Sequence, residues 1–272
     1  MMDEARAQLV ARLLDLQRAD GDWGAGVYDG DEWESTTDAL WLLLELGADP
    51  ADARVRRAVE LVHDRVRWEP RNGGRPFFDG ETEACVNGRV LSLGAAFGHA
   101  SAGLLDRLLA EQLDDGGWNC EAPRSARSSF HSTICVLEGL LAVERATGAD
   151  ERIAAARHRG EEFLLERRLL RRRSDGTLID ETWLPPHVPR YWCYDVLRGL
   201  EHLRASGRNP DPRIHEAVEV LRGLRRADGT WAAVAHPGRP LLELGAVADA
   251  IATRRASGVL AWAAEVGRGG PS

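Results

Sequence analysis

A short motif that occurs three times constrains the fold more than any other feature of this sequence. Each copy follows a helix-like segment and contains Asp-Gly two residues before a tryptophan. The copies span Gln17 to Trp23, Gln112 to Trp118 and Arg225 to Trp231, and the first two read Q-x-x-D-G-x-W. Asp-Gly ends a helix by letting the chain turn sharply. The motif therefore predicts a chain built from helices that end in the same way.

Amphipathic segments alternate with segments that are apolar on nearly all sides. Apolar residues at helical spacing predict amphipathic helices within 3–17, 51–66, 101–113, 150–168 and 211–225. Apolar helices are expected within 35–46, 81–97, 130–143 and 191–203, with one or two more within 241–266. The pair of one amphipathic and one apolar helix recurs about every 45–58 residues, which is the scale of helix-hairpin repeats.

This alternation predicts an all-α protein with two layers. Helices that are apolar all round belong inside, and helices with one polar face belong outside. We expect a single domain over residues 1–272, an (α/α) toroid of five to six helical hairpins. An open solenoid would satisfy the same pattern. A closed ring is favoured because neither end carries an obvious polar capping repeat.

Composition excludes several functions. The chain has 272 residues, a net charge of −8 and no lysine, so lysine Schiff-base chemistry is excluded. An acidic chain has no electrostatic reason to bind nucleic acid or anionic lipid. No apolar run reaches the roughly 20 residues that span a bilayer. The acidic N-terminus does not resemble a signal peptide, so a cytoplasmic protein with reduced cysteines is expected.

The repeated motif resembles the QW repeat of squalene-hopene cyclases and related terpenoid cyclases. These enzymes share an α/α toroid with the β subunits of protein prenyltransferases. Short single-barrel bacterial proteins of this superfamily look closer still, with stretches similar to residues 82–88, 116–120, 129–131 and 191–195. Their D-x-D-D proton donor has no match here. Its nearest counterpart, Asp29 to Glu32, is interpreted as a solvated acidic loop.

Thiols and one imidazole fall at the expected starts of consecutive inner helices. They are Cys85, Cys120, His131 and Cys193. The starts of inner helices share one mouth of a ring, so these side chains are expected to converge on a tetrahedral Zn²⁺. The alternative is that they are buried small hydrophobic residues, which is how we interpret Cys135.

Two carboxylates are candidates for catalysis at the same mouth. Glu83 is a candidate general acid or base, although acidic residues more often cap helix starts. Asp195 would replace Cys193 as a ligand or orient His131.

Nine tryptophans are many for a chain of this length. Trp23, Trp118 and Trp231 belong to the motif and are expected to be structural. A second group is expected to line an apolar substrate pocket and to stabilise cations through their rings. That group is Trp33, Trp183, Tyr191 and Trp192.

These observations predict an enzyme of the terpenoid cyclase and prenyltransferase type, a lyase, isomerase or transferase. It would use a zinc site at the barrel mouth and act on a small, partly apolar substrate. The alternative is a non-catalytic binding or scaffold toroid in which zinc is structural. The sequence leaves the oligomeric state open.

Overall fold

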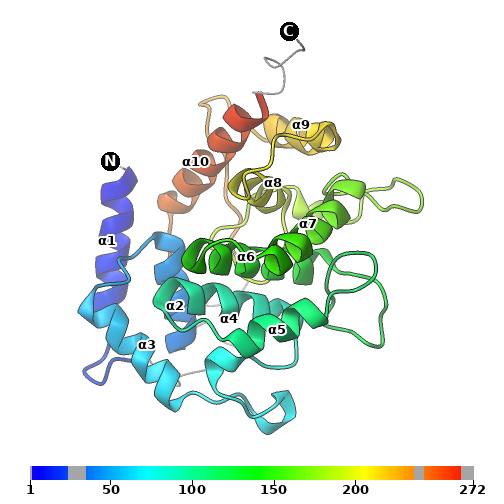
Figure 1. Cartoon of the computed structure of the whole chain (residues 1–272). Coiled ribbons are helices and arrows are strands. Elements are labelled where there is room, and N and C mark those ends of the chain that lie inside the picture. Colours follow the sequence, from blue (N-terminus) through cyan, green and yellow to red (C-terminus); the bar gives the residue numbers. More distant parts are fainter. Residues whose placement is uncertain (1, 24–34, 236–241, 265–272) are drawn as a thin grey trace.

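The computed structural model describes residues 2–23, 35–235 and 242–264, and their regular secondary structure is helical (Figure 1). The described residues form ten α-helices and, apart from isolated bridges, no β-strand. The helices are α1 Met2–Asp15, α2 Thr36–Leu46, α3 Ala53–Arg65, α4 Ala84–Phe97, α5 Ala102–Ala110, α6 Phe130–Thr147, α7 Glu151–Glu166, α8 Val196–Ala205, α9 His215–Gly223 and α10 Ala246–Ala263. Every predicted helix is present, and the last segment forms one helix.

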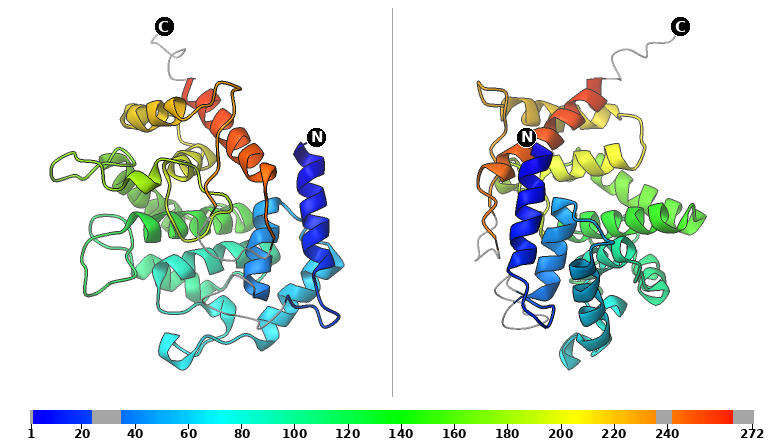
Figure 2. Two further views of the ribbon diagram at one scale, coloured as in Figure 1. Left: turned by 180° about the vertical axis from the view of Figure 1, so that it is seen from behind. Right: turned by 90° about the vertical axis from the view of Figure 1, so that its left-hand side faces the viewer.

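The even-numbered helices contact one another in chain order. Helix α2 contacts α4, α4 contacts α6, α6 contacts α8 and α8 contacts α10, while α1 contacts both α10 and α2. Figure 2 shows α1 standing beside α2 and near α10, so the first and the last helix are neighbours. The burial of side chains agrees with the predicted division into apolar and amphipathic helices. Helix α6 buries residues around most of its circumference, whereas α3 buries only Val55, Ala58, Val59 and Val62.

The repeated motif has the same geometry in all three copies. Each tryptophan is buried, and its indole Nε1 donates to the carbonyl ten residues earlier in the preceding helix. The three indole bonds, to Leu13, Leu108 and Leu221, are each 2.7 Å long. The interpretation of these tryptophans as structural is therefore confirmed.

The glutamine of the motif joins neighbouring helix pairs. Gln112 Nε2 donates to Gly116 O at 2.6 Å, within its own turn, and to Ala156 O at 2.8 Å, on α7. Gln17 makes the equivalent bonds to Gly21 and to Arg54 on α3. One side chain thus satisfies two carbonyls and fixes the end of one odd-numbered helix against the next odd-numbered helix.

Trp118→Phe is expected to lower the free energy of unfolding by about 1–2 kcal/mol, because it removes a buried indole hydrogen bond. Urea denaturation measures the difference. Trp192→Phe is the matched control, because Trp192 is 41% exposed. Equal destabilisation by the two changes would show that the Leu108 bond contributes nothing.

Helices α4 and α6 pack backbone to backbone, and they lie side by side across the centre of Figure 1. A Cβ atom added at Gly88 would lie 2.4 Å from the backbone of Cys135, and one at Gly139 would lie 2.5 Å from Gly88 O. Only glycine permits so close an approach. This contact fixes the start of α4 relative to the loop that leads into α6.

Candidate functional site

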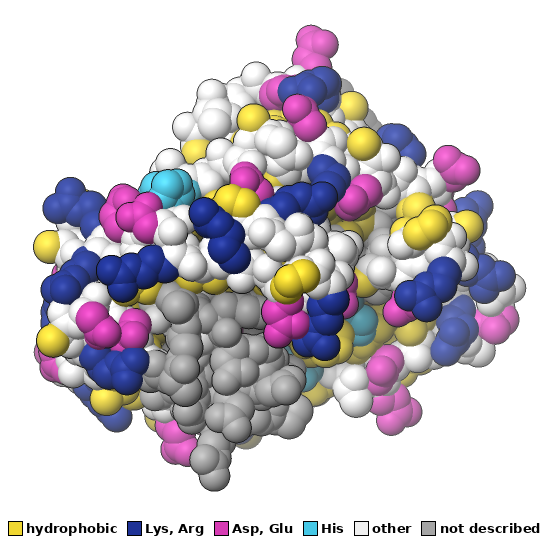
Figure 3. Space-filling view, turned by 90° about the horizontal axis from the view of Figure 1, so that it is seen from below, with side chains coloured by type: hydrophobic (Ala, Val, Ile, Leu, Met, Phe, Trp, Pro, Cys, Tyr) yellow, Lys and Arg dark blue, Asp and Glu magenta, His cyan; other side chains and the backbone are white. Residues whose placement is uncertain are grey.

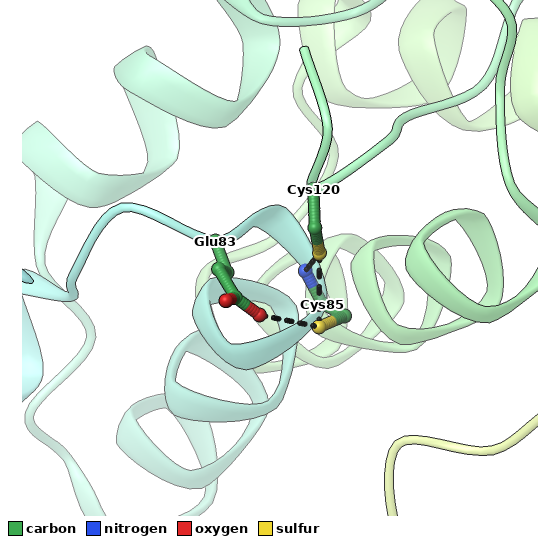
Figure 4. Close-up of side chains that lie close together, drawn as sticks. All are labelled: Glu83, Cys85 and Cys120. Atoms are coloured by element: carbon green, nitrogen blue, oxygen red, sulfur yellow. Dashed lines mark hydrogen bonds between the residues drawn. The ribbon is translucent and has the colours of Figure 1, made fainter. Parts of the chain in front are cut away.

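A cluster of two thiols and one carboxylate lies where α4 begins (Figure 4). The Sγ atoms of Cys85 and Cys120 are 3.0 Å apart, and Cys85 Sγ is 3.7 Å from Glu83 Oε2. The ligand atoms of all three residues lie within 4.8 Å of one another. We call this group the thiol cluster.

Local structure explains how the cluster forms. Glu83 is the residue before α4, and Cys85 lies in its first turn, where backbone N–H groups have no helical partner. Cys120 Sγ accepts the N–H of Cys85 at 3.3 Å, so its sulfur caps the helix. Ser132 on α6 holds Cys120 in place, since its Oγ accepts the N–H of Cys120 at 3.2 Å and lies 3.2 Å from Cys120 Sγ.

The two thiols have different acidities. The hydrogen bond between the two thiols, helped by Ser132 and the Cys85 N–H, outweighs partial burial and lowers the pKa of Cys120 to about 7. The same thiol–thiol bond, together with burial, raises the pKa of Cys85. Partial burial also raises the pKa of Glu83, and the nearby Glu81 carboxylate raises it further. Cys120 is therefore the more nucleophilic sulfur.

The thiol cluster fits a zinc ion chemically. Thiolate and carboxylate are both zinc ligands. Two sulfurs on one tetrahedral ion stand about 3.8 Å apart, so the two Sγ atoms, which are 3.0 Å apart, would have to separate slightly to bind it. Cys85 is buried, Cys120 is half-buried and Glu83 is exposed, so the cluster faces solvent on one side. Three protein ligands and an open side are typical of catalytic rather than structural zinc.

His131 is not part of this cluster, contrary to the predicted ligand set. Its Nδ1 accepts the backbone N–H of Tyr194 at 2.8 Å. In the neutral ring Nε2 then carries the proton, which leaves neither nitrogen a lone pair for a metal. Burial, reinforced by the charge of Arg198, lowers the pKa of His131 and keeps the ring neutral.

Cys193 and Asp195 also lie outside the cluster. Asp195 is buried and caps α8, accepting the N–H groups of Arg198 at 2.7 Å and His187 at 3.1 Å. Both carboxylate oxygens are thereby engaged, and Asp195 does not orient His131. Burial raises the pKa of the Cys193 thiol, which opposes metal binding. Cys135 is fully buried, as predicted.

The predicted aromatic group divides between two places. Trp183 and Trp192 flank His131 edge-on, with ring centroids 5.3 and 5.1 Å away. Tyr191 instead lines a cavity among the even-numbered helices, where burial raises its pKa to about 12. Trp33 lies outside the described residues.

A pocket of about 450 Å³ opens beside His131, and we call it the rim pocket. Its walls include three aromatic rings, from Phe130, Phe163 and Trp183. Four arginines also line it, Arg127, Arg167, Arg172 and Arg173, against the single acid Asp115. The rim pocket is thus apolar at its walls and cationic around them, a combination that the sequence did not reveal.

A second cavity, of about 410 Å³, is lined by residues from α2, α4, α6, α8 and α10. We call it the central cavity. Its charged lining consists of Glu45, Arg89, Glu138, Arg145, Arg190, Arg198, Glu201, Arg204 and Arg255, with His202. The sequence reasoning missed these residues. The sequence feature that could have indicated them is the presence of charged residues, such as Glu45 and Arg89, within otherwise apolar helices.

A buried carboxylate that contacts His202, one of the lining residues, predicts a loss of stability in acid. Burial alone would raise the pKa of Glu161, but hydrogen bonds and charges from His202 and Arg157 outweigh it and lower the pKa to about 2. Because the folded pKa lies below the usual value near 4.5, this stabilisation is complete above about pH 4.5 and is lost as the pH falls toward 2.

We expect the free energy of unfolding to fall by roughly 2 kcal/mol over this range on account of Glu161. Urea denaturation at pH values from 5 to 2 measures it, with Glu161→Gln as the control. That variant should show a correspondingly flatter pH dependence, and an unchanged slope would assign the acid sensitivity to other groups.

No protein-family model matches this chain, and no curated protein matches it. None of the helices formed by residues 2–23, 35–235 and 242–264 is both long and apolar enough to cross a membrane. On the face drawn in Figure 3, acidic and basic side chains alternate without forming one broad basic patch on the coloured surface.

Proposed function

We propose that this chain is a zinc-dependent enzyme of the terpenoid cyclase and prenyltransferase type, folded as an α/α toroid. The order of helix contacts supports the toroid, because the succession from α2 to α10 returns to α2 through α1. The central cavity also supports it, since all five even-numbered helices contribute to its lining.

The observation that carries the proposal is the thiol cluster. Cys85, Cys120 and Glu83 present two sulfurs and a carboxylate within 4.8 Å of one another, at a solvent-facing helix start. When bound, zinc would supply Lewis-acid activation of an incoming thiol or water. The four free cysteines fit a reducing, cytoplasmic setting, in which such ligands stay reduced.

The residues around the metal have distinct tasks in this proposal. Ser132 and the N–H of Cys85 hold the Cys120 sulfur in its thiolate form. Glu83 would complete the ligand set, and its exposure leaves room beside it for the group that binds at the open position.

The rim pocket is the proposed substrate site. Phe130 and Trp183 would receive an apolar or aromatic body, and the arginines around them would receive an anionic group. The pocket lies at the start of α6, the helix whose Ser132 contacts Cys120, so substrate and metal would share one end of the inner layer.

A structural zinc is the second candidate, favoured by one observation. Cys85 belongs to α4 and Cys120 to the loop before α6, and these two helices are the most closely packed pair. A metal between them would fasten the two helices, as in a non-catalytic scaffold.

Metal analysis of untagged protein purified under reducing conditions tests both candidates. We expect one zinc per chain, and its absence would contradict both the catalytic and the structural candidate. Cobalt substitution then separates them, because an exogenous thiol should change the cobalt absorption spectrum only where a coordination position is open. An unchanged spectrum, with unfolding on chelation, would assign the zinc a structural role.

A further inference from the structure

We infer that the central cavity binds a compact, hydrophilic ligand with two or more phosphate or carboxylate groups. This site lies toward the middle and the carboxyl ends of the inner helices, whereas the thiol cluster lies where α4 begins. The inference does not rest on zinc binding.

The charge balance of the lining indicates an anion. Six arginines and three glutamates face this one cavity. The arginines come from α4, α6, α8, α10 and the segment before α8, so positive charge approaches from several sides. A partly enclosed excess of cations is costly unless an anion balances it.

The three glutamates order the arginines more than they neutralise them. Glu138 binds Arg198 through two hydrogen bonds, of 2.9 and 2.6 Å, and Glu45 pairs with Arg255 at 2.8 Å. Glu201 pairs with Arg190. These pairs hold guanidinium groups in defined positions before any ligand arrives, which reduces the entropy cost of binding.

Two further arginines have little acidic compensation. Arg204 is 3.8 Å from Glu201 and 41% exposed, and Arg145 donates to the carbonyl of Ala205 and is exposed. Their planar guanidinium groups suit bidentate binding of phosphate or carboxylate. They are the groups best able to move onto a ligand.

An unsatisfied buried atom provides a second, independent observation. His202 has a fully buried side chain and lines the cavity, and its Nε2 interacts with Glu161. Its Nδ1 has no hydrogen-bond partner among the described residues. Buried polar atoms are nearly always paired, so this nitrogen is an unmet hydrogen-bonding group on a residue that lines the cavity.

The same lining argues against binding of the apolar part of a substrate in this cavity. An apolar chain would desolvate Glu138, Arg198 and their neighbours without making any hydrogen bond to them. A volume of about 410 Å³ admits a molecule the size of a sugar bisphosphate or a tricarboxylate.

Isothermal titration calorimetry at constant ionic strength tests the inference, with pyrophosphate and citrate as probes and glucose as the uncharged control. We expect binding of pyrophosphate, citrate or both, and none of glucose. Binding of pyrophosphate alone would identify the ligand groups as phosphates, and binding of citrate alone would identify them as carboxylates. Absence of binding by both anions would overturn the inference.

Exposed arginines give variants that leave the fold intact. Arg145→Gln and Arg204→Gln should each weaken anion binding about tenfold, the usual worth of one charged hydrogen bond. Arg222→Gln, on α9 and outside the cavity, should leave it unchanged. Equal binding by all three variants would show that the anion binds elsewhere. Cys120→Ser should bind the anion normally, which separates this result from the zinc proposal.

Discussion

Cys120→Ser is expected to lower the zinc affinity of the protein at least about 100-fold, because it replaces the most acidic thiolate ligand with a hydroxyl that stays protonated. The pKa of Cys120, about 7, means that little free energy is needed to form its thiolate at neutral pH. Competition with a chromophoric chelator measures the affinity, and circular dichroism establishes that the variant is folded.

Cys193→Ser is the matched control for this experiment. Cys193 is also half-buried and also precedes an even-numbered helix, α8, but it is not part of the thiol cluster. It should therefore keep full zinc affinity. A loss of affinity in Cys193→Ser equal to that in Cys120→Ser would restore the ligand set predicted from sequence and contradict the proposed one.

Gly88→Ala is expected to lower the free energy of unfolding by at least about 3 kcal/mol, at the upper end of overpacking effects. The added methyl would lie 2.4 Å from the Cys135 backbone, and a helix backbone cannot move aside as a side chain can. Because α4 would shift against α6, the Cys85 and Cys120 sulfurs should also separate. Chemical denaturation and zinc titration of the same variant measure both effects.

Gly103→Ala, within α5, is the control for Gly88→Ala. A Cβ atom there would meet nothing closer than Ser101 Oγ at 3.8 Å. Alanine favours helix over glycine, so stability should be unchanged or rise by up to about 1 kcal/mol. Similar losses in the two variants would mean that the close contact between α4 and α6 is not a source of stability.

The central cavity changes what the family resemblance implies for the ligand. The sequence predicted an apolar, tryptophan-lined pocket, but the cavity among the even-numbered helices carries arginine–glutamate pairs such as Arg198 with Glu138. Aromatic walls occur instead at the rim pocket, around Phe130 and Trp183. An apolar group and an anionic group would therefore bind in different places.

The helices themselves follow from the sequence because their causes are local. The apolar run of α2 and the motif from Gln112 to Trp118 each specify their structure within a few residues. Glycine at position 47 adopts a left-handed conformation and ends α2, as its sequence context predicts. Periodicity, turn residues and caps act over one or two helical turns, so they can be read along the chain.

The grouping of side chains into sites depended on the tertiary structure. Position at a helix start predicted that Cys85, Cys120, His131 and Cys193 would meet, yet the structure brings together only the first two, with Glu83. The backbone N–H of Tyr194 engages His131, and the close approach at Gly88 sets the position of Cys85. Such contacts join residues tens of positions apart, and their distances are fixed by helix packing that no local pattern encodes.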